Sequence, residues 1–292
     1  STTVGTPTRR TRCRFGSRDA GDLDTIGSGL ARPLHRNAAV TITPEYLKRV
    51  SGPGMAIPHL RSRQDVRLVG QLVDRFPPLA DTRGWGATFG RELNATDDRG
   101  LFSSSPGAIP IVEGKHVDPF VVHVSECDQW IANPEALKVR AVWRAARRPR
   151  LAYRDVASST NRLTLIAAIL PRHTMAVHTV FCLRTRLSLR DQTFLCGMLN
   201  SLVANYLARL WVTTHLGTTT VERLPMPRPD AGSDERLRLT GMAHRLGRPG
   251  RDWNAVYARL QALAARLYRL SAEDVRLVLD SFPLIDDAIR RA

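Results

Sequence analysis

The chain of 292 residues is long enough to bury a hydrophobic core, and it is strongly basic: 43 lysines and arginines against 27 acidic residues give a formal charge of +16. Its apolar content of 43% argues against disorder throughout, and no apolar stretch is long enough to span a bilayer. An excess of positive charge favours an anionic partner. Only three of the basic residues are lysines, and arginine's planar fork suits phosphate oxygens and the acceptor edge of guanine.

The amino terminus and the cysteines indicate the cellular compartment in which the protein is expected. Residues 1–14 are basic, but no apolar segment follows them, so they do not form a secretory signal. The four cysteines lack the spacing of a metal site, and Cys182 and Cys196 stand in apolar surroundings typical of the protein interior. We therefore expect a reducing, cytoplasmic setting. Because the chain starts with Ser1, we expect a processed protein or a piece of a longer one.

The first half of the chain predicts an irregular start followed by short elements. Residues 1–40 are polar and rich in glycine and arginine, which predicts a linker or a loosely ordered arm. A helix is expected to begin at Pro44 with Thr43 as its N-cap and to end at residues 51–54. Further on we expect a short helix or strand at 66–73, a strand entering a polar turn over 85–101, a short strand at 110–112, and another at 120–124.

Residues 150–171 are expected to form the centre of the fold. Apolar and polar residues alternate from Leu151, which predicts a half-buried strand, and the polar residues 158–161 predict a turn. The apolar run 163–170, stopped by Pro171, predicts a buried strand, and another strand is expected at 176–183.

The last third is predicted to be mostly helical. Apolar residues at steps of three and four predict one amphipathic helix over 191–210, and a short strand is expected at 218–221. A second helical stripe runs from Trp253 to Leu267, and a third helix starts after Ser271, with Asp274 completing its capping box. Together these elements predict an α+β fold with an arm over 1–40, a mixed-sheet domain over 41–228, and a C-terminal helical appendage over 229–292.

The most basic stretch, residues 138–154, comes just before and within the first central strand. It contains seven basic residues, no acid, and the aromatic residues Trp143 and Tyr153. The alternative is a solvated helix face, but like charges would repel one another there, and phosphate oxygens would relieve that repulsion. We prefer nucleic acid to a membrane as the partner, because no apolar Trp/Leu face accompanies the charge.

Catalytic motifs are absent from the sequence. There is no glycine-rich dinucleotide fingerprint, no phosphate-binding loop and no nucleophile elbow. The eight histidines are scattered. A metal site from His116 and His123 near Asp118 is one alternative, although lone histidines are usually satisfied polar residues.

Glu113-Gly114-Lys115 offers an enzymatic alternative. Some metal-dependent nucleases place an acid and a lysine one residue apart, to hold a divalent ion and orient water, and Asp97 or Asp98 would supply the second acid. The competing interpretation is a tight turn at Gly114 with exposed charges on either side.

Several stretches, taken in their order along the chain, resemble one family. They are residues 90–97 (Gly-Arg-Glu-Leu-Asn-Ala-Thr-Asp), 110–117 (Pro-Ile-Val-Glu-Gly-Lys-His-Val), 151–171, 195–203 (Leu-Cys-Gly-Met-Leu-Asn-Ser-Leu-Val) and 221–227 (Val-Glu-Arg-Leu-Pro-Met-Pro). They are similar to the carboxy-terminal target-recognition region of adenine-specific DNA methyltransferases, including fused enzymes of type IIG restriction-modification and phage-defence systems. The resemblance covers about residues 85–285, and two of the stretches are also similar to type I specificity subunits.

The resemblance implies a DNA target-recognition domain without its catalytic domain. The family's Asn/Asp-Pro-Pro-Tyr/Phe motif and its glycine-containing S-adenosylmethionine loop are absent, and Asn133-Pro134 is followed by Glu135. It therefore implies sequence-specific recognition of double-stranded DNA, no catalytic or metal-binding residue in this chain, and S-adenosylmethionine in a methyltransferase domain or subunit outside it. A base inside a duplex must be flipped out before it is methylated, so a second domain has to hold the duplex.

The DNA contacts are expected from basic residues and polar turns. The turns 94–99 and 158–162 are expected to reach base edges, and the basic run is expected to contact phosphates. For Arg154, an internal ion pair with Asp155 is the alternative. Two other functions stay open, a nuclease using Glu113 and Lys115 and a basic protein-interaction module. The predicted DNA-binding residues are Arg91, Lys115, Arg144, Arg147, Arg148, Arg154 and Arg162.

Overall fold

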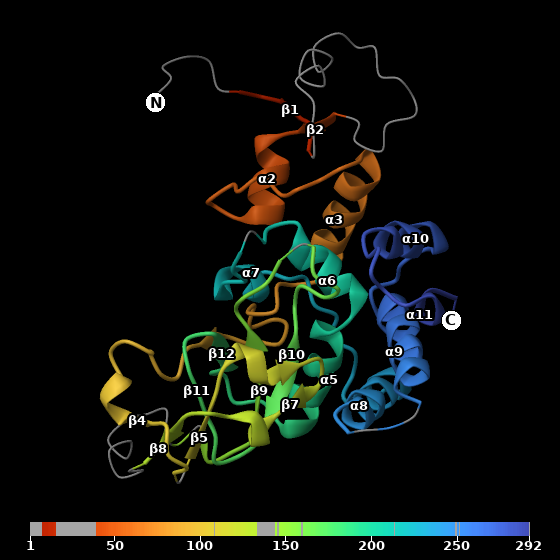
Figure 1. The fold of residues 1–292 in the computed structure, drawn as a ribbon. Helices are drawn as coiled ribbons and strands as arrows, with labels where there is room; N and C mark the ends of the chain where they lie inside the picture. Colours follow the sequence, from red (N-terminus) through yellow and green to blue (C-terminus); the bar gives the residue numbers. More distant parts are fainter. Residues whose placement is uncertain are drawn as a thin grey trace. The chain divides into compact units, whose positions relative to one another are not determined.

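The computed structural model describes residues 8–15, 39–107, 109–132, 144, 146–158, 160–212, 214–248, 250 and 252–291. The chain divides into two compact units, Ser1–Phe76 and Pro77–Ala292. Helices and short strands are present in both, so the predicted α+β class is confirmed (Figure 1). Most of the segment 1–40, predicted to be an arm, lies outside the described residues.

The described part of the first unit includes a strand pair and two helices. Strands β1 (Thr11–Cys13) and β2 (Val40–Ile42) are antiparallel, and α2 (Pro44–Ser51) packs against α3 (Arg63–Arg75). The predicted start of α2 is confirmed, since the Thr43 hydroxyl accepts a hydrogen bond from the backbone N–H of Tyr46 at 3.2 Å. Helix α3 is longer than the element expected at 66–73, because the hydroxyl of Ser62 caps it by accepting from the backbone N–H of Asp65 at 3.1 Å.

The core of the second unit is a four-stranded antiparallel sheet in the order β10-β9-β12-β3. Strand β9, predicted to be half-buried, is buried on both sides: Leu151, Ala152 and Tyr153 have no exposed surface. It is a central strand, helix α5 (Leu189–Leu199) packs against it, and the Tyr153 ring stacks on Phe181. The bounds are β3 (Phe89–Gly90), β9 (Arg150–Arg154), β10 (Ala167–Leu170) and β12 (Val180–Leu183).

A second sheet, in the order β11-β5-β8-β4, is mixed: β11 pairs with β5 in parallel and the other pairs are antiparallel. Its small core includes Ile109, Ile131 and Met175. Turns interrupt several of the predicted strands. Of the strand expected within 85–101 only β3 forms, and the strand expected at 176–183 is divided between β11 and β12. The bounds are β4 (Phe102–Ser103), β5 (Ile109–Val112), β8 (Trp130–Ile131) and β11 (Met175–Ala176), with a hairpin of β6 (Val117–Asp118) and β7 (Val121–Val122).

The single helix predicted over 191–210 is wrong, because the chain forms α5 and then α6 (Leu202–Arg209). Asn200 breaks the helix: its Nδ2 donates to the carbonyl of Ala167 at 2.7 Å, and its Oδ1 accepts from the Ala167 N–H at 3.1 Å. The Ser201 hydroxyl then caps α6 by accepting from the backbone N–H of Ala204 at 3.2 Å. Similarly, Asn205 Oδ1 accepts from the N–H groups of Thr164 and Leu165, both at 2.8 Å, so the first half of the apolar run 163–170 is not a strand.

The predicted strand at 218–221 is also wrong, since these residues belong to α7 (Thr218–Glu222). The β-branched residues favour a strand locally, but the side chain of Glu222 accepts from the Phe89 N–H at 2.7 Å and ties the helical turn to β3.

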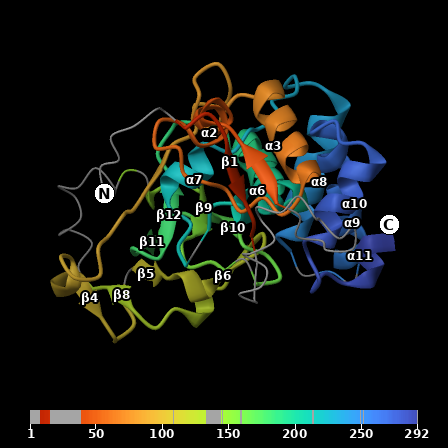
Figure 2. The same ribbon diagram turned by 90° about the horizontal axis from the view of Figure 1, so that it is seen from above.

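Four further helices end the chain: α8 (Asp234–Leu246), α9 (Trp253–Leu267), α10 (Ala272–Asp280) and α11 (Asp287–Arg291). The Ser271–Asp274 capping box at the start of α10 is confirmed, whereas α8 was not predicted. Helix α8 packs on α5, and α9 packs on α8 (Figures 1 and 2). Gly197 allows this close approach, because a Cβ there would lie 2.6 Å from Leu239 Cδ2 and 3.2 Å from Ala243 Cβ.

Candidate nucleic-acid interface

A buried ion pair fixes the start of β9. Arg150 is 4% exposed, and its Nε and Nη2 donate to the two carboxylate oxygens of Glu92, each at 2.5 Å. Nη2 also donates to the carbonyl of Thr174 at 2.9 Å, and Glu92 accepts from the N–H of Ala176 at 2.9 Å. Burial is the largest single influence and would lower the pKa of Arg150, but Glu92 and Cys182 together outweigh it and the pKa is raised. The pair therefore joins β9 to β11 and to the chain beyond β3.

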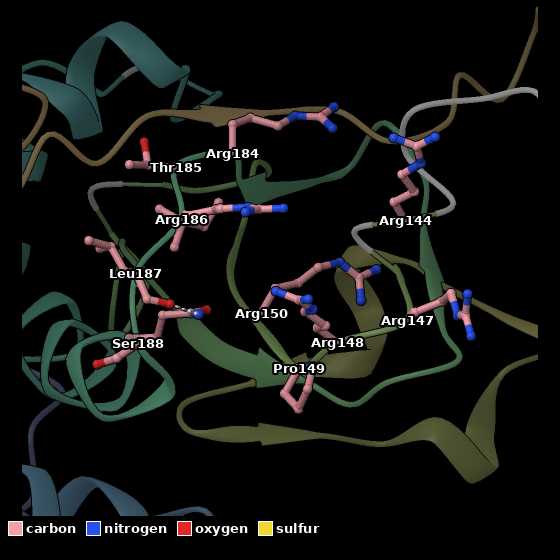
Figure 3. Close-up of a pocket in the computed structure, with 12 residues that line it drawn as sticks. Arg144, Arg147, Arg148, Pro149, Arg150, Arg184, Thr185, Arg186, Leu187 and Ser188 are labelled. Carbon is pink, nitrogen blue, oxygen red and sulfur yellow. Dashed lines mark hydrogen bonds between the residues drawn. The ribbon is translucent and has the colours of Figure 1, made fainter.

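A cavity of about 920 Å³ opens beside this pair. Strands β9 and β12 are antiparallel neighbours, with Cys182 opposite Ala152, so the chain entering β9 and the chain leaving β12 meet at one end of the sheet. Six arginines line the cavity: Arg144, Arg147, Arg148, Arg150, Arg184 and Arg186. Figure 3 shows Arg184 and Arg186 extending across the hollow toward the side on which Arg144 lies.

Most of the charge of this cavity is not neutralised within the described part of the chain, because Glu92 balances only that of Arg150. No acidic residue is among those that line it, and no described acid forms an ion pair with Arg144, Arg147, Arg148 or Arg186. All four side chains belong to exposed residues. Clustered like charges repel one another, so an anion bound in the hollow would be strongly favoured.

The start of α5 forms another part of the wall. Ser188 caps the helix by accepting from the Asp191 N–H at 3.1 Å, and both Ser188 and Gln192 line the cavity. Gln192 holds the two segments together, since it accepts from the Leu151 N–H at 2.7 Å and donates to the carbonyl of Leu187 at 2.9 Å. The partial positive charge of a helix N-terminus adds to the field of the arginines.

Of the seven predicted DNA-binding residues, Arg144, Arg147 and Arg148 lie together at the cavity, and the other four do not line it. Arg91 lies 3.8 Å from Asp155 and over the ring of Phe181 at 5.2 Å. The remainder of the predicted basic run before Arg144, including Lys138, lies outside the described residues.

Lys115 is engaged with acidic neighbours. Its Nζ lies 2.7 Å from a carboxylate oxygen of Asp128 and 3.7 Å from one of Glu113, and the hydrogen bond to Asp128 raises its pKa. Its charge is therefore largely compensated, unlike that of the cavity arginines.

Arg154 and Arg162 also lie away from the cavity. The alternative ion pair between Arg154 and Asp155 is not formed, because Asp155 faces Arg91 and His215 Nδ1, the latter at 3.2 Å. Arg162 is exposed in the turn after β9.

In the two polar turns, several polar side chains form hydrogen bonds within the turn itself. Asn94 Oδ1 accepts from the Thr96 N–H at 2.9 Å, and Asn94 Nδ2 donates to Asp97 at 2.8 Å. In the other turn, the hydroxyls of Ser158 and Thr160 are 2.8 Å apart. Side chains in both turns are therefore partly occupied by internal hydrogen bonds.

The residues proposed for metal chemistry are separately engaged. His116 Nδ1 accepts from the Glu113 N–H at 3.0 Å, whereas His123 Nε2 lies 3.1 Å from Asp118. Across the described ranges, no three His, Cys, Asp or Glu side chains gather closely enough to hold a metal ion. Residues 114–116 form a single 3-10 turn, which fits the tight-turn interpretation of Glu113-Gly114-Lys115.

Arg184 and Arg186 line the cavity but were not among the predicted DNA-binding residues. Their signal was the Arg-Thr-Arg alternation directly after an apolar strand, which places two arginines on the same side of an extended chain. Arg150 belongs to the predicted basic run but was not among the predicted DNA-binding residues. In the described segments, no helix is long and apolar enough to cross a membrane.

The sequence matches no established protein family, and no curated protein is detectably similar to it. Among solved structures, the chain is similar to a chain of the type IIL restriction-modification enzyme MmeI in complex with DNA, with a TM-score of 0.45 and 9% identity over 75% of this chain. It is also similar to a chain of a type I restriction-modification system, with a TM-score of 0.38 and 15% identity over 87% of this chain. The chain spans 37% of the first solved chain and 61% of the second, less than two thirds of either.

Proposed function

We propose that this chain is a double-stranded DNA recognition domain of a restriction-modification enzyme. It holds DNA for methylation of adenine by an S-adenosylmethionine-dependent catalytic domain or subunit outside this chain. The observation that carries the proposal is the cavity at the end of the central sheet, where six arginines from two segments converge. The motifs at residues 90–97, 110–117 and 195–203 support the assignment to methyltransferases.

The cavity supplies the affinity that such a domain needs. A protein that holds a duplex gains most of its binding energy from phosphate contacts, and arginine donates two parallel hydrogen bonds to phosphate oxygens. No acid in the described ranges forms an ion pair with four of the arginines, Arg144, Arg147, Arg148 and Arg186. Their guanidinium N–H groups are therefore available to donate to phosphate.

The test is duplex binding as a function of salt. We expect Arg148→Glu/Arg186→Glu to weaken binding at least about tenfold and to reduce the slope of log K against log salt by about 2, since each phosphate contact contributes about 0.9 to that slope. Arg259→Glu/Arg266→Glu, which changes two exposed arginines of α9, makes the same charge change away from the cavity and is the matched control. No duplex binding by the wild type would overturn the proposal, and equal effects of the two variants would overturn the role of the cavity in holding the duplex.

Sequence specificity requires a separate measurement. Selection of bound duplexes from a random pool is expected to enrich one short sequence, because base-edge contacts discriminate by about 1–3 kcal/mol each. Recovery of the pool without enrichment would contradict specific recognition while leaving general duplex binding in place.

A further inference from the structure

Helices α8 and α9 repeat one surface pattern. In α8, Arg238 is followed by Gly241 and Met242 at the third and fourth positions and by Arg245 at the seventh. In α9, Arg259 is followed in the same way by Ala262, Leu263 and Arg266. Residues spaced by three, four and seven lie on one face of a helix. Each helix therefore presents a small and an apolar residue between two arginines.

Both faces line the same groove of about 500 Å³. The helices pack against each other as a hairpin joined by a short connection, and the groove runs between them. Val256 is buried and Met242 and Leu263 are half-buried, which makes the floor apolar. The space above Gly241 is open, because a Cβ built there would meet no atom within 4 Å.

The walls of the groove carry an excess of positive charge. Arg238 pairs with Asp234 at 2.8 Å, and Arg245 pairs with Asp252. Neither Arg259 nor Arg266 forms an ion pair with an acid of the described ranges, and both are exposed. Four arginines therefore flank an apolar floor, and two carboxylates of the described residues, those of Asp234 and Asp252, pair with them.

We propose that this groove docks an amphipathic helix of a partner protein, with an apolar stripe flanked by glutamates or aspartates. A third helix laid between two others buries the apolar floor at ordinary helix-packing distances of about 8–10 Å. Two arginines seven residues apart are separated by about 10.5 Å along a helix, the same rise that separates two acids seven residues apart on the partner. A DNA backbone matches the arginines but has no apolar stripe to cover the floor. The inference does not depend on the proposed function.

The test uses the full chain and a synthetic probe, a helical peptide with leucines along one face and glutamates on both flanks. Fluorescence polarisation at low salt is expected to show binding to the wild type. Charge reversal in Arg259→Glu/Arg266→Glu is expected to weaken it at least about tenfold, since charge pairs become repulsive. Arg276→Glu, an exposed position on α10, is the control and is expected to change binding less than about twofold.

Three outcomes would overturn the inference. One is no binding of the peptide by the wild type. Another is equal binding of a peptide with serines in place of the leucines, which would reduce the attraction to charge alone. The third is duplex binding that falls as much in Arg259→Glu/Arg266→Glu as in Arg148→Glu/Arg186→Glu, which would assign the groove to DNA. If the charge-reversed variant unfolds, Arg259→Gln/Arg266→Gln serves instead and is expected to weaken peptide binding more than Arg276→Gln does.

Discussion

Single residues of one basic run have opposite roles. Arg150 turns inward to Glu92, 58 positions away in the sequence, whereas Arg147 and Arg148 stay exposed at the cavity. A run of arginines looks uniform in sequence, because the partner that decides burial comes from a distant segment. Arg150 thus fixes the backbone segment that carries the exposed Arg147 and Arg148.

Breaking this pair tests its structural role. We expect Glu92→Gln to destabilise the protein by about 3–5 kcal/mol, because it leaves the Arg150 charge buried without its partner. Urea denaturation measures the loss. Asp128→Asn removes an exposed partner of Lys115 and is expected to cost less than about 1 kcal/mol. Similar costs for the two variants would show that the buried pair is no more important than an exposed one.

The contact between Cys127 and His116 differs from a nucleophilic cysteine–histidine couple. The thiol lies 3.7 Å from Nδ1, but burial raises the pKa of Cys127 to about 11 and lowers the pKa of His116. Both side chains therefore remain neutral at physiological pH, whereas a nucleophilic couple needs a thiolate.

This raised pKa predicts a loss of stability at alkaline pH. Between about pH 9 and 11 the unfolded chain has lost the Cys127 proton while the folded chain retains it. The unfolded state then binds fewer protons, so the free energy of unfolding falls as pH rises. Cys127→Ala is expected to flatten this fall in urea denaturation series, and slow alkylation of the native thiol at pH 8 is the second readout. An unchanged slope and fast alkylation would contradict the neutral buried thiol.

At the scale of elements, helix caps were predictable and breaks were not. Thr43 and Ser271 act within three residues of their own position, so the sequence alone places the starts of α2 and α10. The break at Asn200 depends on the edge of β10, and the helical turn at 218–222 depends on β3. The site follows the same division: Arg144, Arg147 and Arg148 stand in one run, whereas Arg184 and Arg186 join them only through the pairing of β9 with β12.

Asn200 is expected to hold α5 and β10 together. Asn200→Ala removes the donor and acceptor for the Ala167 backbone, and an unsatisfied buried N–H costs about 1–3 kcal/mol. We expect a loss of that size in urea denaturation. Asn94→Ala in an exposed turn is the control, with an expected cost below about 1 kcal/mol. A loss no greater than that of the control would show that another group forms the hydrogen bonds of the Ala167 backbone.

At the scale of the whole molecule, the net charge of +16 is gathered in part on two surfaces of different composition. The cavity beside β9 and β12 has six arginines and no described acid, while the groove between α8 and α9 has an apolar floor and two nearby carboxylates. Attraction through phosphates depends steeply on salt, whereas burial of apolar surface depends on it little.

The two surfaces should therefore respond differently to ionic strength. Raising potassium chloride from about 50 to 200 mM is expected to weaken duplex binding roughly a hundredfold if about four phosphates are contacted. Peptide binding in the groove should weaken less than about tenfold, because screening acts only on its flanking charges. Parallel titrations of the full chain with both probes measure this. Equal salt dependence would mean that the apolar floor contributes nothing to peptide binding and that both probes respond to the same undifferentiated charge.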